Sequence, residues 1–289
     1  MCEHDDLDAF ANRAADVTRR RFTTMALSAG FLAALPRLAT AADTRGTDVD
    51  IKTPDGTADG YFVHPATGRH PGVLIWPDIF GLRPAFKEMA TRLAESGYAV
   101  LVINPFYRTK RAPTAPEHPD FNDPPTRTAL YALAGSLNPT TADTDARAFI
   151  AFLAGQSSVD TKRKFGTTGY CMGGALVLRT AASLPNRIGA AATFHGGGLV
   201  TDKPDSPHLL IPKMKAHFLI AIADNDDKRE PDTKNALRNA FADHHLAAEI
   251  EVYEGAPHGW CPPDSAVYQH DQAEKAWGRL LALFNNSLT

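Results

Sequence analysis

Strands that alternate with helices along most of the chain predict an α/β fold, with a doubly wound, mainly parallel sheet and helices on both faces. Short apolar runs with the length of buried strands recur between residues 72 and 253. Segments with the helical spacing of apolar residues lie between these runs. The chain has 289 residues, which is enough for one large domain of this class.

The expected elements follow one another in order. A β-hairpin at 49–63 comes first, because Pro54-Asp55-Gly56 is a turn signal inside it. The other expected strands cover residues 72–76, 98–103, 164–168, 188–194, 216–223 and 248–253. The expected helices cover residues 84–96, 141–153, 172–183, 231–246 and 265–287. Residues 104–138 are rich in proline and show no clear periodicity, which is typical of a lid or cap segment.

A cysteine lies between small residues at the junction of an expected strand and an expected helix. Gly169 and Gly173 flank Cys171 at positions −2 and +2, in the pattern of a nucleophile elbow. The pattern has a steric reason, since bulky neighbours would collide with the adjoining strand and helix. The N–H of Met172 would then lie free at a helix N-terminus, where it can bind an oxyanion. The alternative is a glycine-rich turn with an inert buried cysteine.

Two further groups follow expected strands in the order that α/β-hydrolases use, which is nucleophile, acid and histidine. The acidic loop after 216–223 contains Asp224, Asp226 and Asp227, and His258 follows 248–253. Functional groups in such sheets lie beyond the carboxyl ends of the strands. Taken alone, the acidic loop could be a solvated turn or a helix N-cap, and His258 a surface turn residue. Because Cys171, the acidic loop and His258 follow one another in the α/β-hydrolase order, we favour a catalytic triad over these alternatives.

Charge and cysteine content exclude several classes of protein. The net charge of −3 gives no basic surface for nucleic acid. The three cysteines, Cys2, Cys171 and Cys261, do not make a disulfide framework, and no Cys/His cluster suggests zinc.

The first 41 residues have the features of an export signal. Arg19 and Arg20 precede a short apolar run at 25–35, and Ala39-Thr40-Ala41 offers a cleavage site. This order resembles a twin-arginine signal peptide. The apolar run is too short for a permanent membrane anchor. We therefore expect a signal peptide at 1–41, a single domain at 42–289, transient contact with export machinery, and a periplasmic or secreted mature protein. A disordered or amphipathic tail is the alternative.

From about Asp48 onward, the chain resembles the dienelactone hydrolase family of α/β-hydrolases. The resemblance rests on five segments, namely WPDIFG at 76–81, GYCMGG at 169–174, FHGGG at 194–198, the acidic loop, and HGW at 258–260. It implies that Cys171 is the nucleophile, His258 the base, and one loop aspartate the group that orients His258. The family pattern G-x-x-D favours Asp226, with Asp227 second and Asp224 third. The resemblance also implies that Ile79 N–H is a second oxyanion donor beside Met172, and that His195 and Trp260 contact substrate.

The sequence departs from the family pattern at two places. The family often has a glutamate that contacts the resting thiol, where this chain has the shorter Asp78. Asp78 could instead cap the following loop. Dienelactone-specific members also carry an arginine soon after the catalytic histidine, and none follows His258 here. Arg108 or Arg111 could replace it, although either could be a solvated surface charge.

These observations predict a hydrolase that cleaves a small carboxylic ester or lactone through a thioester on Cys171, with no metal or organic cofactor. Two alternatives remain on the same fold. One is a non-catalytic binding protein. The other is a thiol redox or peroxide-sensing protein, in which Cys261 could act as the resolving thiol.

Overall fold

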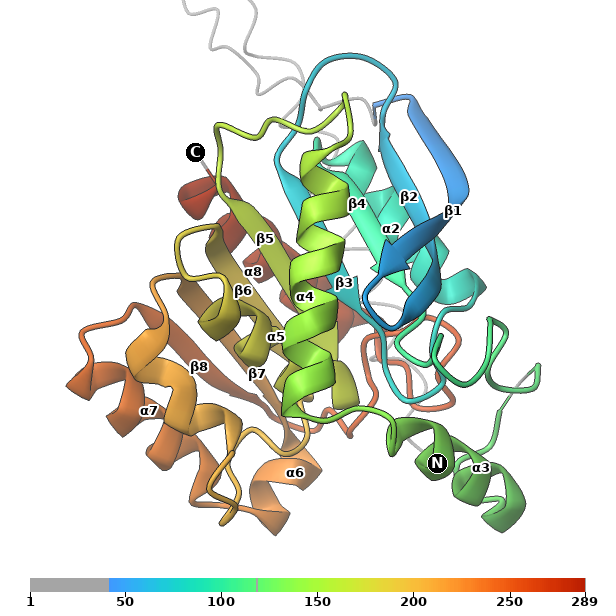
Figure 1. The fold of residues 1–289 in the computed structure, drawn as a ribbon. Coiled ribbons are helices and arrows are strands. Elements are labelled where there is room, and N and C mark those ends of the chain that lie inside the picture. The colour runs from blue at the N-terminus through green and yellow to red at the C-terminus, as the bar shows by residue number, and fades with distance from the viewer. Residues whose placement is uncertain (1–41, 118, 289) are drawn as a thin grey trace, which may run out of the picture. The chain divides into compact units, whose positions relative to one another are not determined.

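The computed structural model describes residues 42–117 and 119–288, and the expected signal peptide lies outside the described residues. The described part contains one eight-stranded sheet with the strand order β1-β2-β4-β3-β5-β6-β7-β8 (Figure 1). Its strands are β1 (Thr44–Thr53), β2 (Gly56–Pro65), β3 (Gly72–Trp76), β4 (Ala99–Ile103), β5 (Phe165–Tyr170), β6 (Ile188–Phe194), β7 (His217–Ala223) and β8 (Ala248–Tyr253).

The sheet is mainly parallel, as the sequence predicts. Only the β1–β2 and β2–β4 pairs are antiparallel, while β3 to β8 all run the same way. The central strands β3 and β4 are buried along their whole length, which explains their continuous apolar sequences. Because β3 and β5 to β8 are parallel, the segments that follow them leave the sheet at the same edge. This edge is the lower one in Figure 1, where α6 (Asp224–Arg229) follows β7.

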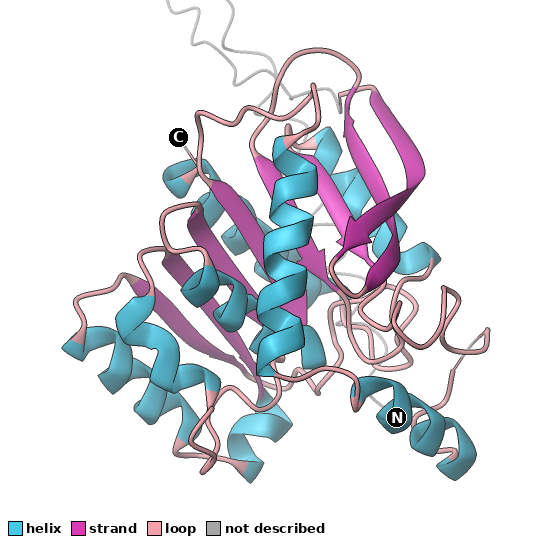
Figure 2. Cartoon of the chain, in the orientation of Figure 1, coloured by secondary structure: helices cyan, strands magenta, loops and turns pink. Residues whose placement is uncertain are grey.

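Helices cover both faces of this sheet, and Figure 2 shows them in one colour against the strands. One face packs against α4 (Pro139–Ala154), α5 (Met172–Ser183), the 3₁₀ helix η1 (Pro207–Lys213) and α7 (Thr233–Asp243), whose buried residues join a single apolar cluster. The other face packs against α2 (Pro84–Glu95) and α8 (His270–Ser287), which belong to a second cluster. None of the helices in the described ranges has the length and apolarity to cross a membrane.

The structure corrects several expected boundaries. The segment at 104–138 contains a helix, α3 (Pro124–Ala134), although its sequence shows no clear periodicity. Asp123 caps this helix by accepting a hydrogen bond from Thr126 N–H, and Pro124 occupies its first position. The acidic loop is itself the short helix α6, with its aspartates in the first turn, where they interact favourably with the helix dipole. The last helix begins at His270, not at residue 265.

Candidate active site

Cys171 lies in the sharp turn between β5 and α5, with φ 53° and ψ −117°. A positive φ is uncommon for a residue with a side chain and is often found at functional sites. The small neighbours are required by packing. A Cβ on Gly169 would lie 2.4 Å from Gly173 O, and a Cβ on Gly173 would lie 2.3 Å from Trp76 O. Both clashes are with backbone, so the turn accepts only glycine at these two positions without a shift.

His258 follows β8 and is held at two points by α6. Its Nδ1–H donates a hydrogen bond to Asp226 Oδ2 over 2.5 Å. Its backbone N–H donates to Asn225 Oδ1 over 2.8 Å. The side chain of Asp226 is largely buried, with 13% exposed. Both the ring and the backbone of His258 are therefore fixed by two adjacent residues of one helix.

The three aspartates of α6 have different partners. Asp226 accepts from His258 through Oδ2 and from Arg229 through Oδ1, over 2.9 Å. Asp227 accepts two hydrogen bonds from Lys234, at 2.8 and 2.6 Å. Asp224 pairs with Lys228 one turn along the helix. Of the three carboxylates, Asp226 is the one that contacts the histidine.

The surroundings of His258 favour its protonated form. Burial alone lowers the pKa of this ring, but hydrogen bonds with Asp226 and Cys171 outweigh burial and raise it to about 10. A protonated imidazole is stabilised by a carboxylate within hydrogen-bond distance. The ring of His258 is therefore placed to hold a proton beside a carboxylate.

Two backbone N–H groups are available near the cysteine. Met172 is the first residue of α5, so its N–H lies at the positive end of a helix dipole. Ile79 lies in the loop after β3, which leaves the sheet at the same edge as β5. Neither N–H donates a hydrogen bond to another residue within 42–117 or 119–288. Both are thus available for a ligand.

Asp78 contacts an arginine and its own loop. Its carboxylate accepts two hydrogen bonds from Arg83, at 2.7 and 2.9 Å, and one from Phe80 N–H at 2.9 Å. Among the described residues, no hydrogen bond joins Asp78 to Cys171. Burial raises the pKa of Asp78, and Arg83 opposes this rise. The loop-capping alternative for this residue matches the contacts that the structure has.

His195 and Trp260 lie in the interior behind His258. The ring of His195 is 5.0 Å from that of His258 and 5.0 Å from that of Trp260, in edge-on arrangements. Trp260 stacks on Tyr253. Both ring nitrogens of His195 are buried and bond to no other described residue, and burial lowers the pKa of the ring well below its usual value. His195 is therefore neutral and in contact with the protonatable His258.

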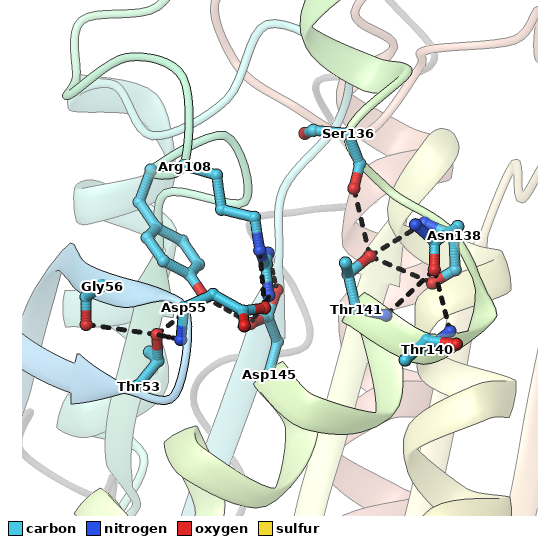
Figure 3. Close-up of polar contacts among 10 residues, drawn as sticks. Thr53, Asp55, Gly56, Arg108, Ser136, Asn138, Thr140, Thr141 and Asp145 are labelled. Atoms are coloured by element: carbon cyan, nitrogen blue, oxygen red, sulfur yellow. Dashed lines mark hydrogen bonds and ion pairs between the residues drawn. The ribbon is translucent and has the colours of Figure 1, made fainter.

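Arg108 and Arg111 are both paired with carboxylates. Figure 3 shows Arg108 between Asp55, in the β1–β2 turn, and the fully buried Asp145 of α4. Arg108 donates to Asp145 over 2.8 and 2.7 Å. Arg111 is exposed and pairs with Asp50. Neither arginine forms a hydrogen bond with Cys171 or His258 within the described ranges.

Cys261 lines a cavity between α2 and α8. This cavity has a volume of about 460 Å³ and is also lined by Tyr170 and Phe194, and neither Cys171 nor His258 lines it. Burial raises the pKa of the Cys261 thiol well above its usual value. Within residues 42–117 and 119–288, no cluster of three His, Cys, Asp or Glu side chains could hold a metal ion.

Sequence reasoning missed three residues that the structure places around the site, namely Arg83, Asn225 and Arg229. Asn225 lies between two aspartates that we considered, yet its contact with His258 N–H depends on how two strand ends meet. Arg229 follows Asp226 at a spacing of three, which is a recognisable helical pair once the acidic loop is known to be a helix. Arg83 directly precedes a proline-initiated helix and has no pattern of its own.

Comparison with known proteins gives consistent matches. The model for the family described as "Dienelactone hydrolase family" matches residues 58–288. A "Carboxymethylenebutenolidase" from Rhodococcus opacus is 28% identical over 247 residues, covering 82% of this chain and 90% of the relative. A "Probable 2-oxo-3-(5-oxofuran-2-ylidene)propanoate lactonase" from a Bradyrhizobium species is 25% identical over 238 residues, covering 81% and 91%.

A solved structure has the same fold. The crystal structure of a "Dienelactone Hydrolase-like Promiscuous Phospotriesterase" from metagenomic libraries superposes with a TM-score of 0.71 at 22% identity. The superposition covers 85% of this chain and 99% of that structure. At this identity the likeness shows the architecture alone.

Proposed function

The chain belongs to the dienelactone hydrolase family and is a hydrolase, and from this premise we propose that it cleaves carboxylic esters or lactones with Cys171 as nucleophile, His258 as base and Asp226 as the orienting carboxylate. The observation that carries the proposal is the arrangement of these three side chains. Cys171 occupies a strained elbow, and the ring of His258, whose pKa is raised by Asp226 and Cys171, is fixed by Asp226 at 2.5 Å. A nucleophile beside a base that is oriented by a third group is the arrangement typical of covalent acyl transfer.

The first half-reaction forms a thioester. Cys171 gives its proton to His258, and Sγ attacks the carbonyl carbon of the ester. The oxyanion that forms accepts hydrogen bonds from Met172 N–H and Ile79 N–H, and one such donor lowers the barrier by about 2.7–4 kcal/mol. The carbon–oxygen bond to the leaving group then breaks, and His258 gives its proton to the departing alkoxide.

The second half-reaction hydrolyses the thioester. His258 takes a proton from water as the water oxygen attacks the acyl carbon. The carbon–sulfur bond breaks, the carboxylic acid leaves, and the sulfur returns as thiolate beside the protonated His258. The raised pKa of His258 suits this state, since the ring must hold the proton while Cys171 is ionised.

The substrate class comes from the chemistry and from the names of the relatives. A thiolate leaves readily, so esters and lactones suit this nucleophile better than amides do. The two relatives are named as a butenolidase and a lactonase. Substrate contacts by Arg108, Arg111, His195 and Trp260 stay predictions.

A redox function has less support. Cys261 is buried, the pKa of its thiol is raised, and it lines a cavity to which Cys171 does not contribute. A resolving thiol has to reach the oxidised cysteine and ionise near neutral pH.

Turnover of a chromogenic short-chain ester tests the proposal. The wild-type chain should release the chromophore with a burst, and mass spectrometry should find the acyl group on Cys171. Cys171→Ala should abolish turnover and keep the same far-UV circular dichroism, because alanine adds no bulk to the elbow. Turnover by Cys171→Ala near the wild-type rate would show that the nucleophile is another group. Oxidation of Cys171 by peroxide with no ester turnover by the wild type would favour the redox alternative.

We further propose twin-arginine export, with Arg19 and Arg20 as the paired arginines and cleavage after Ala41. Support comes from the order of the arginines, the apolar run and the A-x-A site. Replacing both arginines with lysine should leave the protein unprocessed inside the cell, as fractionation and N-terminal mass spectrometry would show. Unchanged processing would rule this pathway out.

A further inference from the structure

Arg83 joins two loops that leave the sheet at the active-site edge. It is the residue just before α2, and its guanidinium binds one carboxylate on each side. On one side it donates to Asp78 over 2.7 and 2.9 Å. On the other it donates to Asp264 over 2.6 and 3.0 Å. Asp78 belongs to the loop of Ile79, whereas Asp264 belongs to the loop that follows His258.

Asp78 closes a short loop around the peptide group of Ile79 with two hydrogen bonds. The side-chain carboxylate of Asp78 accepts a hydrogen bond from Phe80 N–H. The backbone carbonyl of Asp78 accepts one from Gly81 N–H over 2.9 Å. Gly81 has φ 79°, a conformation that glycine adopts without strain. Ile79 is therefore enclosed in a short loop whose only charged side chain, Asp78, is neutralised by Arg83. The direction of the Ile79 N–H depends on this loop.

The arginine itself is held tightly. Its side chain is 11% exposed, that of Asp78 is 8% exposed and that of Asp264 is 39% exposed. The guanidinium carbon lies 5.4 Å from the ring centre of Phe80 and 4.8 Å from that of Phe86. A planar guanidinium can bind two carboxylates with two hydrogen bonds each and stack on rings at the same time, which a lysine cannot do.

We propose that Arg83 is a positioning residue, which directs the Ile79 N–H toward the oxyanion by tying its loop to the loop that follows His258. The proposal rests on the proposed function, because it assumes that an oxyanion forms at Cys171. Arg83 touches neither substrate nor reacting atoms in this role. The effect should therefore fall on the transition state of acyl transfer and not on the thiolate itself.

Two reactions of the same cysteine separate these effects. Ester hydrolysis needs the oxyanion donors. Alkylation of Cys171 by iodoacetamide does not, since Sγ attacks a methylene carbon and iodide leaves without an oxyanion. We expect Arg83→Lys to lower kcat for the chromogenic ester by about 10- to 100-fold, as loss or misplacement of an oxyanion donor does, with KM unchanged. The alkylation rate of Cys171, followed by peptide mass spectrometry, should stay at the wild-type value.

Arg92→Lys is the matched control. Arg92 lies in α2, the helix that Arg83 precedes, donates two hydrogen bonds to Glu274 of α8, and stacks 4.3 Å over the ring of Trp277. Like Arg83 it pairs with a carboxylate and stacks on an aromatic ring, but it binds one carboxylate instead of two and lies away from the two loops, so this variant should keep both rates. Asp264→Asn serves as a second test should Arg83→Lys fail to fold. It weakens only the outer contact and should lower kcat by a smaller factor, again with unchanged alkylation.

The outcomes are distinct. Wild-type kcat in Arg83→Lys, or in Asp264→Asn where Arg83→Lys is unfolded, would overturn this proposal alone. If ester turnover and alkylation fell together in Arg83→Lys, the effect would act on the nucleophile itself, which would also overturn the proposal. If kcat fell as far in Arg92→Lys as in Arg83→Lys, the effect would act on the whole fold, with the same consequence. A wild-type chain that is alkylated but hydrolyses no ester would overturn the proposed function and this role with it.

Discussion

His258 and Asp226 are joined by a hydrogen bond of 2.5 Å, although they come from segments that follow different strands. The strands β7 and β8 pair in parallel, with Ala223 opposite Tyr253, so both segments leave the sheet side by side. The neighbouring Asp227 turns to Lys234 instead. The pairing of β7 with β8 thus brings α6 beside His258, and the direction of each side chain on α6 decides which of the two adjacent carboxylates meets the histidine.

Substitution of the two aspartates should affect the rate very unequally. Asp226→Asn replaces the carboxylate that holds the Nδ1–H tautomer of His258 with a neutral amide, and the comparable change in a serine protease lowers kcat by about 10⁴. Asp227→Asn breaks only the contact with Lys234 and should leave kcat near the wild-type value. Steady-state kinetics with one chromogenic ester compares the two variants. Equal losses, or a larger loss in Asp227→Asn, would transfer the orienting role to Asp227.

The stability of the protein should depend on pH through His258. The hydrogen bonds of this ring with Asp226 and Cys171 outweigh burial and raise its pKa from 6.5 to about 10 in the folded state. The pKa of His258 is higher in the folded than in the unfolded state, so the protonated ring stabilises the fold. This contribution is complete below pH 6.5 and is lost as the pH rises from 6.5 through about 10.

Thermal unfolding of Asp226→Asn across this range checks the dependence. The Tm gap between the wild type and this variant should be widest below pH 6.5 and should narrow toward pH 10. Asp227→Asn is the control, since its partner is a lysine and not a histidine, and it should show no such trend. A gap for Asp226→Asn that stays constant with pH would contradict the assignment of the raised pKa to this contact.

Gly173→Ala should destabilise the protein and lower activity together. The added Cβ would lie 2.3 Å from Trp76 O and 2.8 Å from Pro77 O, so the elbow must move away from the end of β3. Overpacking of this kind typically costs about 1–3 kcal/mol. Urea denaturation and ester turnover give the two readouts.

Gly278→Ala is the matched control for that substitution. Gly278 lies in α8, and a Cβ there would meet no atom within 4 Å. Alanine at this position should raise the unfolding free energy by roughly 0.5–1 kcal/mol, because glycine is the poorer helix former. A Gly173→Ala variant as stable and active as the Gly278→Ala variant would show that the elbow tolerates a side chain.

The enzyme should hydrolyse a neutral ester better than its carboxylate-bearing analogue. No arginine follows His258 closely, and the charges of Arg108 and Arg111 are already neutralised by Asp145, Asp55 and Asp50. A substrate carboxylate buried without a free cation costs several kcal/mol. The ratio of kcat/KM for a matched ester pair measures this preference.

Variants of the two arginines test the same prediction. Arg111→Ala removes an exposed charge and should leave the ratio unchanged. Arg108→Ala leaves the buried Asp145 without its cation, so its stability must be measured beside its kinetics. If the enzyme prefers the carboxylate-bearing ester and keeps this preference in both variants, the prediction is contradicted and another cation binds the carboxylate. If the preference is lost in one variant, that arginine is the binding group.

Short-range patterns in the sequence determined the sheet class and the position of the elbow that carries the proposed nucleophile, Cys171. Strand and helix periodicity predicted the parallel sheet, and Gly169 and Gly173 marked the elbow, because steric demands act between residues close in the chain. The helix α3 escaped prediction, since its boundary depends on the Asp123 cap and not on apolar periodicity.

Only the tertiary structure decided the partners of the charged groups. Asp78, Asp226 and Asp227 look alike in the sequence, yet they pair with Arg83, His258 and Lys234 respectively. Arg83 and Lys234 lie close in sequence to these aspartates. His258 reaches Asp226 from a distant segment, and so does Asp264, the second partner of Arg83. The energy of an ion pair depends on separation and burial, and both are set by which strand ends lie side by side in the folded sheet.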